Sequence, residues 1–186
     1  MLIALILAHL QAVLIPLLIA MRCRGWFLKS GFACFSLASL AEMVDHTNTD
    51  WIYVNHSSFF NGIFYSALAT GLALLTAAMS SSRSWRLPLL LVTFAALAAY
   101  PYPLAGKSVA IVLQSVLLVL MLKQWWRCFA DPRLLLYVLF GVVLTTGLGA
   151  LLVGSGDQTW HVFIGPCGSL SVISLDWVMR RANTTA

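Results

Sequence analysis

The feature that most constrains this chain is a series of long apolar runs, separated by short breaks that contain charged or turn-forming residues. Hydrophobic residues make up 61% of the 186 residues and charged residues only 9%, whereas a soluble domain carries roughly a quarter charged residues. Such a chain cannot form a soluble surface, so its helices must be solvated by lipid and must satisfy their backbone hydrogen bonds internally. The sequence therefore predicts an all-α integral membrane protein.

Seven of these runs can be counted, and most have the ~20 residues that a helix needs to cross the hydrocarbon core. Because they use the whole chain, we expect residues 1–186 to form one polytopic domain, a compact bundle of seven transmembrane helices. The expected spans are residues 2–21, 26–44, 54–79, 87–104, 108–122, 134–154 and 161–179.

Basic residues predict the orientation of this bundle. With seven spans, ten of the eleven lysines and arginines fall on one side of the membrane, and only Lys107 falls on the other. Since connections rich in lysine and arginine stay in the cytoplasm, we expect the N-terminus outside and the C-terminus inside. Topology thus explains the net charge of +5, and we expect membrane lipids and no nucleic acid as partners. The expected location is the plasma membrane, or the inner membrane if the source is a bacterium.

Histidines and most carboxylates gather on the opposite, predicted outer side. One inner exception is Asp176, which we expect to pair with Arg180 one helical turn later. All four histidines and four of the six carboxylates belong to the outer group: His9, His46, His56, His161, Glu42, Asp45, Asp50 and Asp157.

The end of the second predicted span carries an ordered set of polar residues. Ser39, Glu42 and His46 are spaced i, i+3, i+7 and therefore share one helical stripe, with Asp45 on its flank. Glu42 lies about one turn inside the outer boundary, where a carboxylate exposed to lipid would cost several kcal/mol. We therefore expect Glu42 to face the bundle and to have a partner, either His46 or a bound cation.

Three histidines are expected to converge at one depth. His46 ends the second span, His56 follows it across a short outer connection, and His161 begins the seventh span. Three imidazoles with an open position for water are a suitable ligand set for zinc. We therefore predict zinc bound by His46, His56 and His161, with His9 as a further wall of the site. The alternative is that these histidines are only amphipathic residues at the membrane boundary.

Glycines in the last two predicted spans are expected at close contacts between helices rather than at a ligand. They are Gly141, Gly147, Gly149, Gly165 and Gly168.

The layout of the chain resembles the superfamily of alkaline ceramidases and progestin/adiponectin receptors. Those proteins are similar in carrying Ser-xxx-His at the end of the second helix, Asp near the start of the third and His-xxx-His on the seventh. Here Glu42 stands four residues before His46 where the family has serine, His56 lies near the position of the family aspartate, and Gly165 replaces the last histidine. The resemblance implies zinc held by three histidines and cleavage of lipid amides by metal-activated water.

Together these features predict a zinc-dependent hydrolase that acts on a lipid amide or ester at the outer side of the membrane. In that mechanism Glu42 or Asp45 takes a proton from metal-bound water as the general base, and Ser39 hydrogen-bonds the oxyanion or that water. The alternative is a non-enzymatic sensor, transporter or assembly subunit with an outer site for a cation or another ligand. A transporter would need ionisable residues along a path to the other face, and the inner halves of the spans carry only Asp176.

Overall fold

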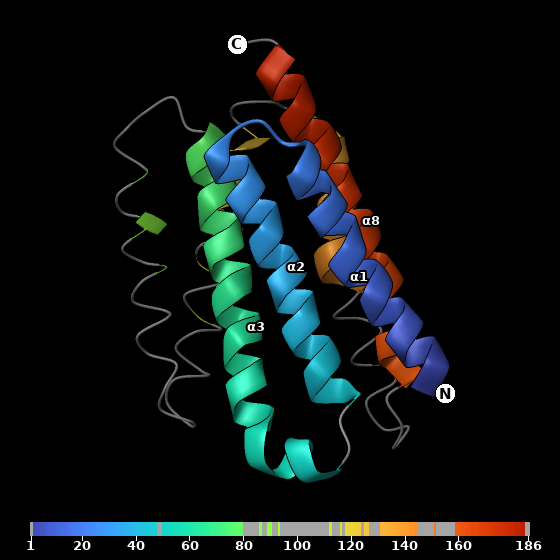
Figure 1. Cartoon of the computed structure of the whole chain (residues 1–186). Coiled ribbons are helices and arrows are strands. Elements are labelled where there is room, and N and C mark those ends of the chain that lie inside the picture. The colour runs from blue at the N-terminus through green and yellow to red at the C-terminus, as the bar shows by residue number, and fades with distance from the viewer. Residues whose placement is uncertain are drawn as a thin grey trace.

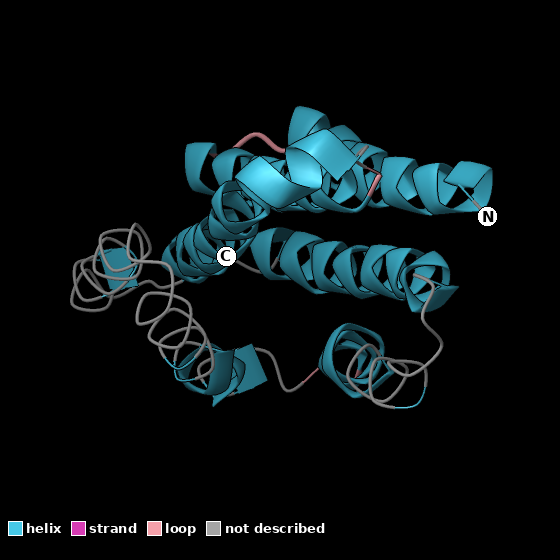
Figure 2. Ribbon diagram, turned by 90° about the horizontal axis from the view of Figure 1, so that it is seen from below, coloured by secondary structure: helices cyan, strands magenta, loops and turns pink. Residues whose placement is uncertain are grey.

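The computed structural model describes the backbone of residues 2–47, 50–79, 131–144 and 159–184, with short pieces between 86 and 126 and at 151. Side chains are described for a smaller set, which leaves out those of residues 2, 50–58, 79, 159–160 and 181–184 in the helices. Every element in this part of the chain is a helix, and none of its residues lies in a strand (Figure 2). The prediction of an all-α protein is confirmed for these residues.

Four long helices form the described body of the molecule, and a shorter helical segment packs beside them (Figure 1). α2 packs against both α1 and α3, and α1 packs against α8. α8 packs in turn against α6 and against η1, the π-helical segment that continues α6. The elements are α1 (Leu2–Arg22), α2 (Trp26–His46), α3 (Asp50–Met79), α6 (Arg133–Val138), η1 (Leu139–Leu144) and α8 (Thr159–Thr184).

Short connections make α1, α2 and α3 run in alternate directions, so each end of the bundle collects particular residues (Figure 1). The first turns of α1, α3 and α8 and the last turn of α2 lie together at the bottom of Figure 1. We call this the histidine end. The opposite end, at the top of the figure, holds the connection between α1 and α2 and the C-terminal part of α8. We call it the arginine end, because Arg22, Arg24 and Arg180 lie there.

Four helices in the described residues are long and apolar enough to cross a membrane: Ile3–Arg22, Trp26–His46, Phe59–Ala78 and His161–Arg180. Large apolar side chains cover their outward faces. On α1, for example, the side chains of Ile3, Leu7 and Leu18 are 75%, 60% and 50% exposed. Such faces are stable against lipid and unstable against water. The helices therefore belong to an integral, multi-pass membrane protein.

The described helices include the first, second, third and seventh predicted spans. The second helix continues to His46 and the third begins four residues later, so their connection is shorter than predicted. Predicted spans 87–104 and 108–122 lie largely outside the described residues, and 134–154 is described as a continuous helix only as far as Leu144. The count of seven helices and the orientation of the termini stay predictions.

An apolar core fills the arginine half of the long helices. At the histidine end the buried residues include two imidazoles and a carboxylate, those of His9, His161 and Asp45. The core takes members from all four helices: Ile19, Ala20, Phe32, Phe35, Leu72, Leu75, Leu175, Val178 and Met179.

Two facing glycines set the spacing of α2 and α3. A Cβ atom on Gly71 would lie 2.9 Å from the carbonyl oxygen of Gly31 and 2.8 Å from the ring of Phe35. In the other direction, a Cβ atom on Gly31 would lie 3.2 Å from the carbonyl oxygen of Gly71 and 2.7 Å from Leu75. Membrane helices gain their association energy from such close packing, because lipid tails are as apolar as leucine. The α2–α3 contact therefore depends on both glycines.

Gly71→Ala should lower the free energy of unfolding by about 1–3 kcal/mol, because an added methyl group overpacks a contact between two backbones. Gly168→Ala is the matched control, since among the described residues a Cβ atom on Gly168 meets no atom within 4 Å. Thermal unfolding of both variants in detergent checks the expectation. Equal stability of the two variants would contradict the role given to Gly71.

Candidate metal centre

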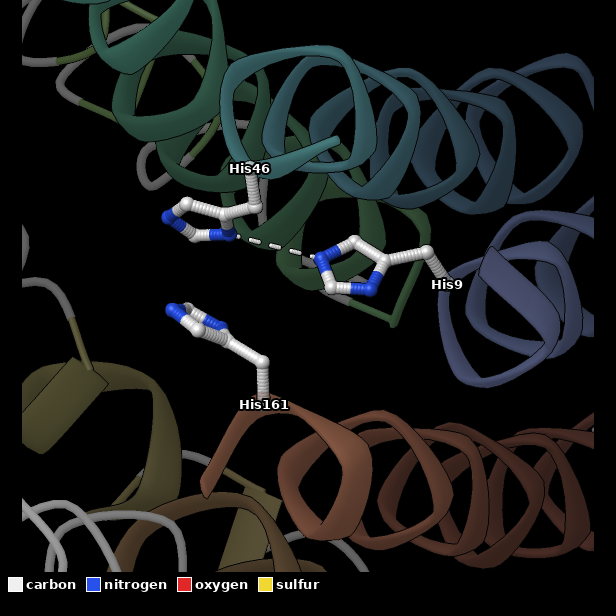
Figure 3. Close-up of side chains that lie close together, drawn as sticks. All are labelled: His9, His46 and His161. Carbon is white, nitrogen blue, oxygen red and sulfur yellow. Dashed lines mark hydrogen bonds between the residues drawn. The ribbon is translucent and has the colours of Figure 1, made fainter. Parts of the chain in front are cut away.

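Three histidines from three different helices meet at the histidine end (Figure 3). His9 lies about two turns into α1, His46 is the last residue of α2, and His161 lies in the first turn of α8. One ligand nitrogen of each residue lies within 4.8 Å of the others. The ring centroids of His46 and His161 are 3.6 Å apart, and His9 lies 5.6 and 5.7 Å from them. We call these three residues the histidine cluster.

His9 is held in one ring orientation by its own helix. The residue is 3% exposed, and its Nδ1 atom lies 3.0 Å from the carbonyl oxygen of Leu5, one turn earlier. A carbonyl oxygen can only accept, so Nδ1 carries the proton and donates it. The neutral ring therefore presents the lone pair of Nε2 toward the cluster, and backbone carbonyls orient many metal-binding histidines in this way.

The Nε2 atom of His9 faces Nδ1 of His46 at 3.4 Å. In the absence of an ion, the Nδ1–H group of His46 donates a hydrogen bond to this lone pair. The other ring nitrogen of His46, Nε2, lies 3.8 Å from Oδ2 of Asp45. His46 can therefore carry its proton beside that carboxylate instead, which leaves two facing lone pairs that one cation can bridge.

Asp45 links the cluster to α3. Its side chain is almost fully buried, and Oδ2 accepts a hydrogen bond of 2.9 Å from the Nδ2 atom of Asn61. A buried carboxylate needs such donors, because desolvation alone would strongly disfavour it. The bond therefore fixes the carboxylate beside His46.

Glu42 lies beside His161. Its Oε1 atom is 3.9 Å from Nδ1 of His161. That separation is too long for a direct hydrogen bond but short enough for electrostatic attraction or for one bridging water. The sequence suggested His46 or a cation as the partner of Glu42, and the structure gives His161.

A cavity of about 220 Å³ opens beside the histidine cluster. Water occupies about 30 Å³ per molecule in the liquid, so several waters or a small ligand fit inside. An ion bound by the cluster could therefore keep an open coordination position. The polar walls of the cavity are Glu42, Asp45, His46, Asn61, Tyr65 and His161.

The donor set and its spacing fit a transition-metal ion. Zinc binds imidazole nitrogen at about 2.0–2.1 Å, so two ligand nitrogens of a tetrahedral site lie about 3.4 Å apart. The distance of 3.4 Å between His9 and His46 already matches one edge of that tetrahedron. The third ligand, from His161, lies within 4.8 Å and would need to move by roughly 1 Å to complete the site.

Gly165 allows His9 and His161 to meet. A Cβ atom on Gly165 would lie 2.7 Å from the carbonyl oxygen of Ala8 and 3.0 Å from its Cβ atom. Ala8 precedes His9 on α1, and Gly165 follows His161 by one turn on α8. The expected close packing is confirmed at Gly165, whereas a Cβ atom on Gly168 would lie within 4 Å of none of the described residues. The two helices therefore touch backbone to backbone directly beside the cluster.

The residues predicted from the sequence divide into three groups. His46 and His161 come together, with Glu42 and Asp45 beside them. Ser39 lies on α2 about 10 Å from His46 along the helix axis, and the cavity walls in the described part of the chain do not include it. The side chain of His56 lies outside the described residues.

The third imidazole of the described cluster is that of His9, which the sequence suggested only as a further wall. The available signal was its depth on the same side of the membrane as the other histidines. Depth in the membrane does not show which helices are neighbours. The contact between Ala8 and Gly165 places α1 next to α8 and so brings His9 to His161.

Comparison with known proteins gives one family. A family described as "Seven transmembrane receptor" (7TM_cyano) matches residues 1–185. Neither a curated protein nor a solved structure matches the chain significantly.

This match overturns the resemblance to the ceramidases and progestin/adiponectin receptors, because the family that covers the chain is a different one. The departures in the motifs are consistent with that correction. Gly165 stands in place of the last histidine because α8 must approach Ala8 there, and the histidine cluster takes its third member from α1. The resemblance rested on the layout of helices and polar residues, and such a layout does not determine a function. The chain belongs to the seven-transmembrane receptor family.

Proposed function

We propose that this protein is a membrane receptor that senses a divalent transition-metal ion, zinc by its donor set, at the histidine cluster. The observation that carries the proposal is the convergence of His9, His46 and His161 from three separate helices, with one ligand nitrogen of each within 4.8 Å of the others. Family membership supports the receptor part of the proposal.

A receptor explains the site better than a hydrolase does. The hydrolase prediction rested on the donor set and on the resemblance to the ceramidases, and the family match removes the resemblance. What remains is a site that can bind an ion. Three imidazoles from three helices suit a sensor, because an ion that pulls them together changes the packing of those helices.

The local chemistry favours zinc over a hard cation such as calcium or magnesium. Calcium and magnesium prefer oxygen ligands, whereas imidazole nitrogen suits zinc and its neighbours in the first transition series. Asp45 and Glu42 lie next to His46 and His161 rather than within the group of ligand nitrogens. In that position a carboxylate orients the imidazole and raises its basicity toward the metal.

Binding would draw the histidine ends of α1, α2 and α8 together. The ligand nitrogens would move from within 4.8 Å toward the spacing of about 3.4 Å of a zinc site. An ion can shift a conformational equilibrium only by its difference in affinity for the two states. With the histidine ends drawn together, all three imidazoles can bind the ion at once, whereas with those ends apart fewer can. The ion therefore has a higher affinity for the arrangement in which the ends are drawn together.

We also propose that the chain has seven spans with the N-terminus outside, so that the cluster meets ions from the outer side. The basic residues support this orientation, because ten of eleven fall on the other side under that count. The family description agrees with seven spans. A transport path has less support, since Asp176 is the single carboxylate in the inner halves of the predicted spans.

The cluster should bind one zinc ion per chain, and His9→Ala, His46→Ala or His161→Ala should each lower the affinity by at least about 100-fold. The measurement is titration of purified, chelator-treated protein in detergent, with metal content determined by elemental analysis. His56→Ala is the matched control, because it removes the one remaining histidine of the chain. This variant should bind zinc as the parent does.

Each other outcome of that titration has a definite meaning. Loss of binding in His56→Ala but not in His9→Ala would restore the ligand set predicted from the sequence and contradict the described one. Absence of zinc binding in the parent, with all four variants unchanged, would refute the proposed function.

Gly165→Ala should weaken zinc binding at least about tenfold without removing any ligand, because the added methyl group separates His9 from His161. Gly168→Ala should leave the affinity unchanged, since a Cβ atom there meets no atom within 4 Å in the part of the chain that the structure describes. Gly71→Ala is a second control, because it disturbs a helix contact away from the site. Equal weakening by Gly71→Ala and Gly165→Ala would show a general loss of stability and would contradict the positioning role of Gly165.

A receptor must pass the binding event to its far end. Zinc should therefore change hydrogen exchange of backbone amides at the arginine end, at residues 22–29 and 176–184, by several-fold as well as at the histidine end. The measurement is hydrogen exchange by mass spectrometry with and without zinc, and His161→Ala should abolish both changes. Protection confined to the histidine end would mean a structural metal and would contradict a receptor.

A further inference from the structure

A second cavity lies at the arginine end, on the opposite side of the bundle from the histidine cluster. Its volume is about 760 Å³, within the range of roughly 300–1,000 Å³ found for small-molecule sites. The connection between α1 and α2 forms one wall, and α3 and α8 contribute Ala78 and Met179. Four arginines line it in the described part of the chain: Arg22, Arg24, Arg86 and Arg180.

The charge of this cavity is strongly positive. Among its described lining residues, Asp176 is the single carboxylate against four guanidinium groups, which gives a formal charge of +3. Burial, and next the negative charge of Asp176, raise the pKa of the neighbouring Cys23 thiol. Cys23 therefore stays neutral and adds no second negative charge.

Two of the arginines are fixed by neighbouring groups. The Nε–H group of Arg180 donates a hydrogen bond of 2.8 Å to Oδ2 of Asp176, as the i, i+4 spacing predicted. The guanidinium carbon of Arg86 lies 5.6 Å from the ring centroid of Phe27, close enough for a cation–π interaction. Ordered guanidinium groups lose less freedom when an anion binds, so the cavity is partly preorganised.

The cavity continues into an apolar groove between α1 and α8. This groove has a volume of about 390 Å³, and it shares Arg22, Asp176 and Arg180 with the cavity. The side chains of Leu18 and Trp177 are each 50% exposed along it, facing outward from the bundle. Its remaining walls are also apolar: Ile15, Ile19 and Ile173.

We propose that this cavity binds the phosphate head group of an anionic phospholipid, with an acyl chain of that lipid in the groove between α1 and α8. Guanidinium groups match phosphate oxygens with paired hydrogen bonds, and each positive charge near the membrane surface adds attraction to an anionic lipid. A soluble phosphate would use the arginines alone, whereas the groove gives a lipid additional apolar contact. The continuity of charged cavity and apolar groove therefore favours the lipid.

The test compares lipids that differ only in head group. Delipidated, full-length protein in detergent is titrated with phosphatidylglycerol or with phosphatidylcholine of the same acyl chains, and bound lipid is counted by native mass spectrometry. The parent should prefer phosphatidylglycerol at least about tenfold, and Arg22→Ala/Arg24→Ala should abolish this preference. Both arginines are exposed, so the double variant should fold. Thermal unfolding checks that it does.

Lys29→Ala/Lys123→Ala is the matched control, because it removes the same charge from exposed residues that line neither the cavity nor the groove. This control should keep the preference, whereas Arg22→Lys/Arg24→Lys should lose part of it, since lysine retains charge without the paired hydrogen bonds. Equal loss of the preference in Arg22→Ala/Arg24→Ala and in Lys29→Ala/Lys123→Ala would mean that the lipid is attracted by the charge of the whole surface, and it would overturn the proposal. Displacement of the lipid by equimolar glycerol 3-phosphate would identify a soluble phosphate site and would also overturn it.

Discussion

The contact between Gly165 of α8 and Ala8 of α1 is the interaction on which the candidate metal centre depends. A Cβ atom on Gly165 would lie 2.7 Å from the backbone of Ala8, so the two helices meet there with no room for a side chain on α8. His9 and His161 lie next to this contact and therefore point into the same space. The axes of two packed helices usually lie about 8–10 Å apart, depending on the side chains at the contact. A larger separation of α1 and α8 would place the imidazoles of His9 and His161 out of reach of one ion.

The histidine end buries polar side chains in a bundle that is surrounded by lipid. A polar group in hydrocarbon costs free energy unless it has a partner, and two buried residues of this end have a hydrogen-bond partner: His9 donates to Leu5, and Asp45 accepts from Asn61. In the arginine half most buried side chains are apolar, and the buried carboxylate of Asp176 accepts a hydrogen bond from Arg180. The chain thus places a polar, adjustable site and a close-packed core on the same helices. A rigid core is what allows a movement at one end to be carried along a helix rather than absorbed.

Much of this arrangement follows from the sequence by periodicity and charge. Apolar runs predicted α1, α2, α3 and α8, and counting charges predicted that His46, His161 and their carboxylates lie at one end. The sequence analysis predicted His56 as the third imidazole, whereas the described cluster contains His9, because the third member depends on which helix approaches α8. Contacts between helices are set by small residues such as Gly165, and a glycine at one position does not reveal its partner. The ceramidase resemblance failed for a related reason, since the order of helices and polar ends recurs in families with different chemistry.

The two proposed sites are connected by the helices that they share. α1 carries His9 near one end and Arg22 at the other, and α8 carries His161 near one end and Arg180 at the other. A change in the angle between α1 and α8 that draws His9 toward His161 must also alter the groove between Ile15, Leu18 and Ile173, because the same two helices form its walls. Linkage then requires reciprocity: if zinc changes the affinity for a lipid by some factor, the lipid changes the affinity for zinc by the same factor. A receptor built on this pair of helices would therefore respond to the lipid around it as well as to the ion, and its sensitivity to zinc would depend on the membrane in which it lies.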